Sequence, residues 1–312
     1  MSTEYNEDNL VEQATVDILE DIGWETQTAW GNETFGEHGN LGRENKSEVV
    51  LAKYLLPALE ALNPNLPAQA YKDAYLQIIQ RDADKTLDRT NKEKYELIKS
   101  GVKVSFTNDK GELTKKTLKV FDFNNPDNNH FLAVRQLEVT GELYNRRPDV
   151  VGFVNGIPLV FFELKAHTRD LRHAYDDNLK DYKDTIPHLF HTNAFVILSN
   201  GIDTQDNSGT KIGTITSAFK FFHEWKRISE NVEGIVSLDT TIRGTCSKAN
   251  LLDLFENFLL FDDAGGDVSK ILAKNHQYLG VNKALAQMSD ADSISELKNK
   301  LGVFWHTQGS GK

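Results

Sequence analysis

A twenty-residue stretch decides the fold of this chain: Arg146-Arg147-Pro148-Asp149-Val-Val-Gly-Phe-Val-Asn155-Gly156-Ile-Pro-Leu-Val-Phe-Phe-Glu163-Leu164-Lys165. Asn-Gly between two apolar runs is a strong signal for a tight β-hairpin, because both residues tolerate the positive φ angles of such a turn. The stretch therefore predicts a strand over residues 149–154, a turn at Asn155-Gly156 and a second strand over residues 157–164. The second strand is apolar enough to be buried on both faces.

The hairpin carries two acidic side chains and a lysine that can meet only under one condition. A strict two-residue turn pairs Asp149 with Phe162, which puts the Asp149 and Glu163 side chains on opposite faces of the sheet. A shared site therefore requires a register shift of one residue, through a bulge or a three-residue loop. Pro158 lacks a backbone N–H for the ladder, so we expect the irregularity there.

These polar residues have two interpretations. Asp149 and Glu163 are either ordinary polar ends of a sheet edge, or ligands of a divalent cation that activates water for phosphodiester cleavage. Glu163 and Lys165 follow directly after a buried strand, and they share one face because side chains alternate along a strand. An acid and a lysine are costly to place there without partners, which favours the second interpretation.

The stretch from Glu142 to Lys165 resembles a known family. Pro148-Asp149 and Glu163-Leu164-Lys165 match the PD-(D/E)xK nuclease motif, and the residues around them resemble the nuclease core of the restriction (R) subunit of type I restriction-modification enzymes. The resemblance covers most of the chain. It implies an endonuclease domain whose full-length protein cleaves DNA after ATP-driven translocation, with Mg²⁺ as the cofactor of cleavage.

The resemblance also implies catalytic roles for the residues of the motif. Asp149 and Glu163 would ligate Mg²⁺. Lys165 would orient or deprotonate the attacking water and stabilise the charge that builds on the phosphate.

Three residues outside the motif are further candidates by resemblance. Glu12 stands where the family has an acid near the nuclease site, and its alternative is a plain surface glutamate. The family's Gln-x-x-x-Tyr motif falls on Asn178 and Tyr182, four residues apart on one helical face, where they would position the backbone of the site. Asparagine replaces the glutamine, which leaves the role of Asn178 open. For Tyr182 the alternative is a core aromatic residue.

The last residues resemble a nucleotide-binding loop. An apolar segment runs into His306-Thr-Gln-Gly309-Ser-Gly311-Lys312, and Gly309, Gly311 and Lys312 match the end of a P-loop, whose backbone N–H groups cradle phosphates. His306 replaces the first glycine of the general pattern, as it does in type I R subunits. ATP is therefore expected as a ligand of the full-length protein. A chain that stops at Lys312 lacks the rest of a RecA-like motor, so we expect no ATP hydrolysis from it.

One further residue is a candidate for binding ATP. Gln277, in the run Asn275-His-Gln-Tyr278, resembles the glutamine that reads adenine in superfamily-2 helicases. The alternative is an ordinary polar residue at the surface.

The net charge of −11 at pH 7 argues against a free-standing binder of DNA, because duplex affinity comes largely from neutralising phosphates. A local basic surface, or delivery of DNA by other subunits, would remove this objection. Four arginines flank the acidic pair and are candidates for that surface, with a solvated charged face as the alternative: Arg146, Arg147, Arg169 and Arg172. The expected partners are double-stranded DNA and, by resemblance, the methyltransferase and specificity subunits of a type I complex.

Composition places the chain among ordinary globular proteins, with 39% hydrophobic and 26% charged residues. No apolar run approaches the roughly 20 residues that span a bilayer, and the acidic N-terminus is unlike a signal peptide. The single cysteine, Cys246, excludes an internal disulfide framework. Cytoplasmic residence without membrane contact is the expectation.

The patterns together predict an α/β fold: a PD-(D/E)xK restriction-endonuclease-like core with a mixed central sheet flanked by helices, followed by the first part of a RecA-like motor domain. We expect an endonuclease domain over residues 1–245, and a linker with the truncated start of the translocase over residues 246–312. The predicted strands are 102–106, 117–123, 131–139, 149–154, 157–164, 193–199 and 210–217. The predicted helices are 8–22, 47–62 (capped by Ser47), 67–82, 90–100, 169–183, 248–261 and 281–287, and residues 25–46 are expected to form a loop.

A second functional hypothesis comes from a different class. The chain could be a nuclease-shaped binding module that docks the modification-and-specificity core without cutting DNA. The acidic net charge favours docking for the isolated chain, whereas the intact Asp149, Glu163 and Lys165 set favours a nuclease. Loss of Mg²⁺ or Mn²⁺ binding in Asp149→Ala would discriminate between them.

Overall fold

The computed structural model describes residues 7–108, 110–203, 208–232 and 234–289. Its helical elements are α1 (Glu7–Asp21), α2 (Ala52–Leu62), α3 (Ala68–Ile79), α4 (Leu87–Ser100), η1 (Pro126–Asn128), α5 (Leu171–His173), η2 (Ala174–Leu179), α6 (Lys180–Thr185), η3 (Pro187–Phe190), η4 (Phe219–Phe221), α7 (Leu238–Cys246), α8 (Lys248–Asn257) and α9 (Asn275–Ser289). Its strands are β1 (Glu25–Thr28), β2 (Val102–Thr107), β3 (Leu113–Leu118), β4 (Phe131–Arg135), β5 (Val139–Thr140), β6 (Asn145–Arg146), β7 (Val150–Val154), β8 (Ile157–Leu164), β9 (Phe195–Asp203), β10 (Ser208–Gly213), β11 (Leu259–Asp262) and β12 (Ser269–Leu272).

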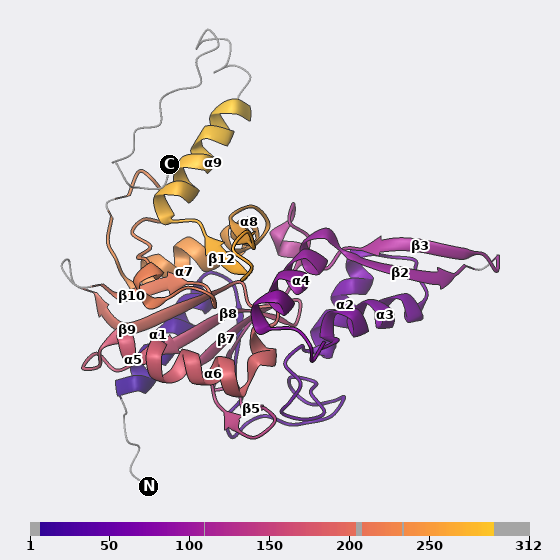
Figure 1. The fold of residues 1–312 in the computed structure, drawn as a ribbon, viewed down its shortest axis with the longest axis horizontal. Coiled ribbons are helices and arrows are strands. Elements are labelled where there is room, and N and C mark those ends of the chain that lie inside the picture. Colours follow the sequence, from indigo (N-terminus) through magenta and orange to yellow (C-terminus); the bar gives the residue numbers. More distant parts are fainter. Residues whose placement is uncertain (1–6, 109, 204–207, 233, 290–312) are drawn as a thin grey trace.

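A six-stranded mixed sheet forms the centre of the molecule, as predicted (Figure 1). Its strand order is β1-β4-β7-β8-β9-β10. β1 runs parallel to β4 and β8 runs parallel to β9, whereas the other neighbours are antiparallel. The predicted hairpin supplies the two middle strands, β7 and β8, and every residue of both is buried. The apolar run of the second strand therefore indicated its central place correctly.

The hairpin contains the predicted turn and the predicted register shift. Asn155 and Gly156 both have positive φ angles, 48° and 75°. Phe153 pairs with Pro158, but Gly152 pairs with Val160, so one extra residue lies on β8 immediately after the proline. A Cβ on Gly156 would lie 2.4 Å from the Leu51 carbonyl oxygen, because the turn packs directly against the start of α2. The turn thus needs glycine for its space as well as for its angle.

Two apolar cores lie on opposite faces of the sheet. Val150, Val160 and Phe162 belong to the core that includes α1, α3, α7 and α8. Val151 and Phe161 belong to the other core, which α5, η2 and α6 cover. In Figure 1, α1 and α6 lie on different sides of the sheet. The sheet is therefore the middle layer of an α/β/α arrangement.

Several predicted boundaries are wrong. Residues 25–28 were expected in a loop, but they form β1, which pairs with β4 as the edge of the sheet. The strand predicted at 117–123 is β3 at Leu113–Leu118, which pairs with β2 outside the central sheet. The strand predicted at 131–139 stops at Arg135, because Gln136 has a φ of 51° and turns the chain. β1 is short and polar, so its sequence carries no strand signal.

The predicted helices also differ from the observed ones in detail. The helix expected from Ser47 begins at Ala52 with Leu51 as its N-cap residue, so Ser47 is not the cap. The helix expected over 169–183 is a composite of α5, the π-helical segment η2 and α6. α7 was not predicted, because it is short and rich in threonine. The predicted helix at 281–287 is part of the longer α9.

Residues on both sides of the predicted domain boundary share one core. Trp24 donates from its indole N–H to the Cys246 carbonyl (2.9 Å), and the Tyr95 hydroxyl donates to the Leu259 carbonyl (3.2 Å). Phe255 packs against Tyr95 with ring centroids 5.0 Å apart. The boundary at residue 245 stays a prediction, and it falls inside this shared core. None of the helices in the described ranges is long and apolar enough to cross a membrane.

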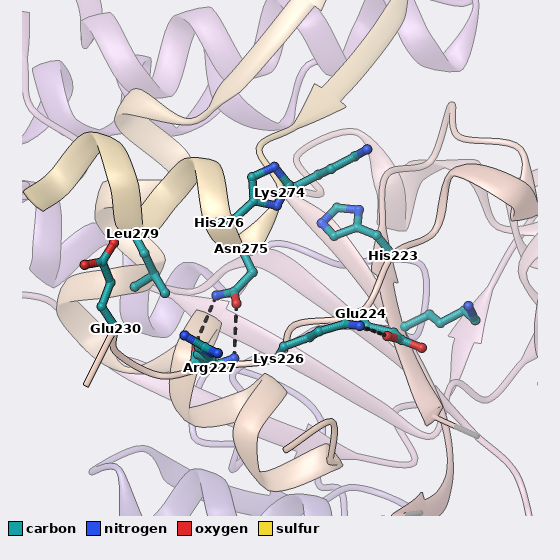
Figure 2. Close-up of a pocket in the computed structure, with 10 residues that line it drawn as sticks. His223, Glu224, Lys226, Arg227, Glu230, Lys274, Asn275, His276 and Leu279 are labelled. Carbon is teal, nitrogen blue, oxygen red and sulfur yellow. Dashed lines mark hydrogen bonds and ion pairs between the residues drawn. The ribbon is translucent and has the colours of Figure 1, made fainter. Parts of the chain in front are cut away.

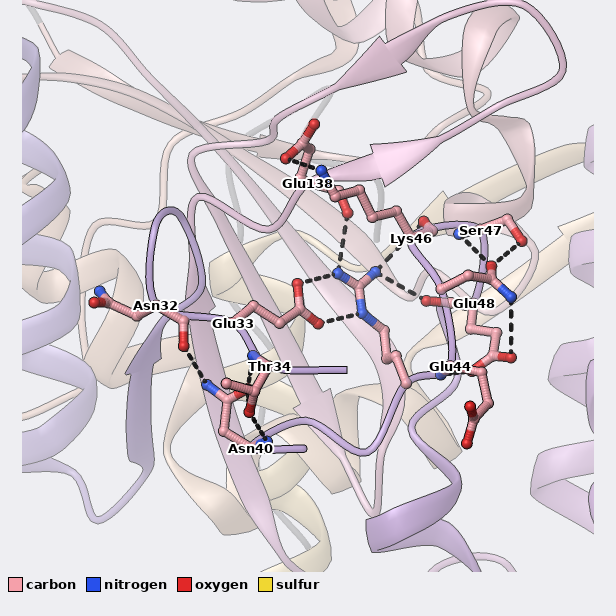
Figure 3. Close-up of polar contacts among 11 residues, drawn as sticks. Asn32, Glu33, Thr34, Asn40, Glu44, Lys46, Ser47, Glu48 and Glu138 are labelled. Atoms are coloured by element: carbon pink, nitrogen blue, oxygen red, sulfur yellow. Dashed lines mark hydrogen bonds and ion pairs between the residues drawn. The ribbon is translucent and has the colours of Figure 1, made fainter. Parts of the chain in front are cut away.

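A buried arginine holds the long connection between β1 and α2 (Figure 3). The Arg43 guanidinium has no solvent exposure and donates to both carboxylate oxygens of Glu33, at 2.7 and 2.5 Å. It also donates to the carbonyl oxygens of Glu48 (3.0 Å) and Glu138 (3.1 Å). The last contact ties the connection to the segment that follows β4. Every part of this buried charge therefore has a partner, which is the condition for tolerating it.

Replacing Arg43 by methionine should destabilise the protein by about 3–5 kcal/mol, because the Glu33 carboxylate would remain buried without a partner. The free energy of unfolding in urea measures the effect. The double variant Arg43→Met/Glu33→Met removes both charges and should recover part of the loss. A single variant as stable as the double variant would contradict this account.

A second buried cation, Lys270 on β12, forms no ion pair with any acid in the part of the chain that the structure describes. Its ammonium donates to the Asn91 side-chain oxygen at 3.0 Å and to the Asn193 carbonyl, and both acceptors are neutral. Burial lowers the pKa of Lys270 from 10.5 to about 7. The unfolded chain therefore binds one more proton than the folded chain between about pH 7 and pH 10.

Stability should therefore rise with pH across this window, by up to about 1.4 kcal/mol per pH unit for this one group. Lys270→Met should flatten the dependence, because the variant has no proton to lose there. Urea unfolding between pH 7 and pH 9.5 measures the slope. Lys72→Met, which removes an exposed lysine of α3, is the control and should keep the wild-type slope. Equal slopes in all three proteins would show that Lys270 stays charged in the fold.

Candidate functional site

The register shift brings Asp149 and Glu163 to the same place. Val150 pairs with Phe162, so one further step along the hairpin sets Asp149 opposite Glu163 on the face of Val151 and Phe161. Directly opposed residues of an antiparallel pair have Cβ atoms about 5 Å apart. The Leu164 backbone N–H donates to the Asp149 carboxylate at 2.7 Å, which fixes that carboxylate beside the end of β8.

Glu163 is a buried carboxylate with an unused oxygen. Its side chain has no solvent exposure, and among the described residues Oε2 has no hydrogen-bond partner. Burial raises the pKa of Glu163 well above its usual range, and the Asp149 charge raises it further. Lys165 opposes this shift in the Glu163 pKa without cancelling it. The fold therefore keeps an acid in a position that is unfavourable for the charged form.

Lys165 forms an ion pair with Glu163. Its ammonium lies 2.5 Å from Glu163 Oε1, and its side chain is 13% exposed. Its backbone N–H donates to the Ser199 carbonyl at 2.8 Å, so the parallel neighbour β9 continues to hold the chain beyond β8. The ammonium therefore stands between the buried acid and solvent.

Glu12 approaches the pair but is held by two other residues. It is buried on α1, and its Oε2 accepts from Arg135 Nε at 2.6 Å and from Gln136 Nε2 at 2.9 Å. The expected surface alternative is therefore wrong for Glu12. Its charge contributes to the raised pKa of Glu163, although less than the charge of Asp149 does.

Tyr182 and Asn178 meet on the helix that covers this face. Tyr182 is buried on α6 and packs edge-on against Phe161, with ring centroids 5.7 Å apart. Burial raises the Tyr182 pKa, Glu163 and Asp149 raise it further, and the Asn178 side chain opposes the change. Tyr182 is thus both a core aromatic residue and a neighbour of the carboxylate pair. Asn178 lies in the π-helical segment η2, and such segments are frequent at functional sites.

Two of the four candidate arginines are paired with acids, and the basic surface that they were expected to form stays a prediction. Arg146 is paired with Asp181, and Arg172 is paired with Asp176 at 2.8 Å. Arg147 lies over the exposed Trp30 ring, 4.1 Å from its centroid. Arg169 is exposed. Two of the four charges are therefore already neutralised by neighbouring acids.

The candidate ATP-binding residues are covered only in part. Gly309, Gly311 and Lys312 lie outside the described residues. Gln277 lies in the first turn of α9, where its side-chain oxygen accepts from the Lys274 backbone N–H at 2.8 Å. This contact is a helix-start contact, so it neither supports nor contradicts a role in reading adenine.

An open pocket of about 690 Å³ lies beside the start of α9 (Figure 2). Asn275 lines it and exchanges two hydrogen bonds with the Arg227 backbone, at 2.9 and 3.1 Å. Lys226 and Lys274 line the pocket together with Glu224 and Glu230. Lys211 and Arg227 also line it, so four cationic side chains face two acids, and Lys226 is paired with Glu224 at 3.0 Å.

Asp149 and Glu163 could contribute carboxylate oxygens to a metal ion, because they lie opposite each other at the ends of β7 and β8. Their oxygen donors suit a hard divalent cation, and Glu163 Oε2 is available. Within the described ranges, however, no group of three or more acidic, histidine or cysteine side chains is gathered closely enough to form a complete ligand set. Water and a bound phosphate would have to complete the coordination of any ion here.

Gln136 is a site residue that the sequence did not reveal. Its side chain contacts both oxygens of Glu12, and its backbone N–H donates to the Asp149 carbonyl at 2.8 Å. It therefore joins α1 to the start of β7. Its left-handed conformation is uncommon for glutamine, so composition and periodicity offered no signal for it.

Two family models and several relatives match this chain. The family model described as "Type I restriction enzyme R protein N terminus" matches residues 4–210, and that of the "SWI2/SNF2 ATPase" family matches residues 276–312. The chain is 35% identical over 98% of its length to the type I restriction enzyme HindI endonuclease subunit of Haemophilus influenzae. It is 29% identical over 98% of its length to the putative type I restriction enzyme MjaIXP endonuclease subunit of Methanocaldococcus jannaschii.

The chain belongs to the type I restriction enzyme R protein family, whose N-terminal region it matches. It spans 29% of the length of the Haemophilus relative and 30% of the Methanocaldococcus relative. The resemblance inferred from the residues around the hairpin is therefore confirmed.

Asp149→Asn should change how stability depends on pH in the metal-free chain. Glu163 has a raised pKa in the fold, so its contribution to stability is lost as pH rises from about 4.5 through that raised pKa. Removing the Asp149 charge lowers the Glu163 pKa, and the loss should shrink by on the order of 1 kcal/mol. Urea unfolding in EDTA at pH 5 and pH 8 measures the difference.

Glu142→Gln is the matched control, because it removes one exposed acid from the preceding turn. This control should lose as much stability between pH 5 and pH 8 as the wild type. If Asp149→Asn does the same, the two carboxylates are not coupled.

Proposed function

We propose that this chain carries the Mg²⁺-dependent DNA endonuclease site of a type I restriction enzyme, built as a PD-(D/E)xK nuclease core. One observation carries the proposal: the unpartnered Oε2 of the fully buried Glu163, beside Asp149 and within reach of the Lys165 ammonium. A purely structural glutamate at this place would gain stability by pairing both oxygens or by becoming apolar. The family membership supports the proposal.

Asp149 and Glu163 are the residues proposed to hold Mg²⁺. A bound Mg²⁺ would supply Lewis-acid chemistry, lowering the pKa of a bound water and neutralising phosphate charge. A divalent cation would also relieve the repulsion that raises the Glu163 pKa. Glu163 Oε2, which has no hydrogen-bond partner among the described residues, would then coordinate the cation.

Lys165 is proposed to act on the attacking water and the scissile phosphate. Its ammonium lies 2.5 Å from Glu163 Oε1, which orients it beside the acids. From there it can orient the water and stabilise the charge that develops on the phosphate oxygens. Tyr182 and Asn178 form the wall behind the pair and hold its geometry, and the salt bridge to Arg135 holds Glu12 near them.

The full-length protein is proposed to couple this site to ATP-driven translocation. The match of residues 276–312 to the SWI2/SNF2 ATPase family supports a motor linked to the nuclease. A tethered motor raises the local concentration of DNA at a site that binds duplex weakly. In this arrangement ATP, double-stranded DNA, and the methyltransferase and specificity subunits are all needed for cleavage, although the bond-breaking step itself uses only Mg²⁺.

Metal binding by this chain tests the proposal directly. Mn²⁺ titration followed by electron paramagnetic resonance should show a site that Asp149→Ala abolishes, because half of the protein ligand set is lost. Lys165→Ala should keep Mn²⁺ binding and yet reduce cleavage by the complete complex by about 100-fold or more, since it removes only charge stabilisation. Asp239→Asn, which removes an acid on α7 away from the pair, should change neither property.

Two results would sink the assignment. If Lys165→Ala also loses Mn²⁺, then Lys165 is structural. If the wild-type chain binds no Mn²⁺ while Asp149→Ala leaves cleavage by the complex intact, then the chain is a docking module and the nuclease site lies elsewhere.

A further inference from the structure

The DNA-binding surface expected beside the nuclease site is weak in charge. Arg146 and Arg172 pair with acids, and Arg147 packs on Trp30. The chain as a whole carries a net charge of −11. Because a duplex is bound largely through neutralised phosphates, positive charge has to be sought elsewhere in the molecule.

A projecting two-stranded ribbon supplies that charge. Residues 102–119, here called the lysine ribbon, contain five lysines and two acids, so the segment is positive within an acidic chain. β2 and β3 extend away from the central sheet beyond α3 (Figure 1). In the part of the ribbon that the structure describes, four exposed lysines lie outside its tip turn: Lys103, Lys115, Lys116 and Lys119.

The ribbon has one buried face and one exposed face. Val102 and Leu118 pair across the strands and are buried in the core near α3. Lys103 pairs with Thr117, and Lys115 pairs with Ser105, so all four side chains share the outer face and all are exposed. Lys103 and Lys115 are therefore diagonal neighbours, about 7–8 Å apart at their Cα atoms.

The ribbon lysines have no anionic partners among the described residues. None of the seventeen ion pairs in the described ranges includes Lys103, Lys115, Lys116 or Lys119. By contrast, lysines of the body such as Lys46 and Lys92 are paired. Unpaired lysines on a thin projection repel one another, so the ribbon is electrostatically suited to an anionic partner.

We propose that the lysine ribbon binds the phosphate backbone of double-stranded DNA, away from the cleavage site. This inference rests on the proposed function, because it takes duplex DNA as the substrate. A two-stranded β-ribbon fits the major groove of B-DNA, where both phosphate backbones flank it. The outer face offers lysines, serine and threonine but no base-reading arginine or glutamine, so the contact is independent of sequence.

The position of the ribbon sets the length of DNA involved. Its base lies at the turn end of the β7–β8 hairpin, where Asn155 donates to the Val120 carbonyl at 2.9 Å. The carboxylate pair lies at the other end of β8, roughly 25 Å away at about 3.3 Å per residue. A duplex that touches both places spans on the order of one helical turn, which is about 34 Å. The ribbon therefore acts as an anchor rather than as part of the cleavage site.

Fluorescence anisotropy with a labelled 40-base-pair duplex in EDTA tests the proposal, with KCl varied from low to physiological concentrations. The triple variant Lys103→Gln/Lys115→Gln/Lys119→Gln should raise Kd about tenfold or more near 0.1 M salt. It should also reduce the magnitude of the slope of log K against log[KCl] by about 2–3, because fewer counterions are released when fewer phosphate contacts form. The arginine triple at the same positions should restore wild-type binding.

A matched control separates the ribbon from overall charge. Lys220→Gln/Lys226→Gln/Lys274→Gln removes an equal number of positive charges, from η4 and from the pocket beside α9. This control should leave Kd within about twofold of the wild-type value. Equal weakening by the two glutamine triples would overturn the proposal. So would unchanged binding in the ribbon triple, failure of the arginine triple, or no duplex binding by the wild-type chain at low salt.

Asp149→Ala distinguishes this inference from the proposed function. The ribbon triple should keep the Mn²⁺ site, and Asp149→Ala should lose Mn²⁺ while still binding duplex in EDTA. A chain without an Mn²⁺ site that still binds duplex through the ribbon would retain the inference and refute the metal-dependent nuclease. A chain that has the Mn²⁺ site but whose duplex binding is unchanged in the ribbon triple would retain the metal-dependent nuclease and refute the DNA-binding role of the ribbon.

Discussion

The single extra residue on β8 after Pro158 is the constraint on which the site depends. Without it, Asp149 would oppose Phe162, and the two carboxylates would lie on different faces of a fully buried hairpin. With it, both acids lie on the face covered by α6, beside Tyr182. The shift also lets two consecutive residues, Leu159 and Val160, pack into the same core, the one that includes α1. One irregularity thus satisfies the packing of one face and the chemistry of the other.

The buried charges of this protein fall into two groups. Arg43 is saturated by a bidentate carboxylate and backbone carbonyls, as expected for a charge whose task is to hold loops together. Glu163 is equally buried but has an unused oxygen, a repelling neighbour and one lysine. Burial by itself is therefore a poor guide to function. Counting the partners of each donor and acceptor distinguishes a fully paired structural charge, Arg43, from a candidate functional one, Glu163.

The middle of the sheet could be predicted from the sequence because its signals are local. Asn155-Gly156 specified the turn, the apolar run marked β8 as buried, and Pro158 marked the bulge. β1 could not be predicted, because its four polar residues form a strand only through parallel pairing with β4, more than 100 residues later. The end of β4 at Gln136 could not be predicted either, because a φ of 51° is uncommon for glutamine and its contacts with Glu12 and Asp149 exist only in the folded chain. The sequence likewise does not show which arginines are ion-paired, because an acid such as Asp181 reaches Arg146 only in the folded chain.

The link from Glu12 through Gln136 to Asp149 has a consequence for the order of assembly. The β7–β8 hairpin closes over a short loop and can form early, whereas the contact between Glu12 and Gln136 spans 124 residues and must overcome a much larger loop-closure entropy. On a growing chain the carboxylate pair can therefore exist before the first helix docks against it. Docking of that helix fixes the start of β7, because Glu12 holds Gln136 and the Gln136 backbone N–H donates to the Asp149 carbonyl. In a partly folded chain the hairpin can therefore bring Asp149 and Glu163 together before α1 fixes their positions.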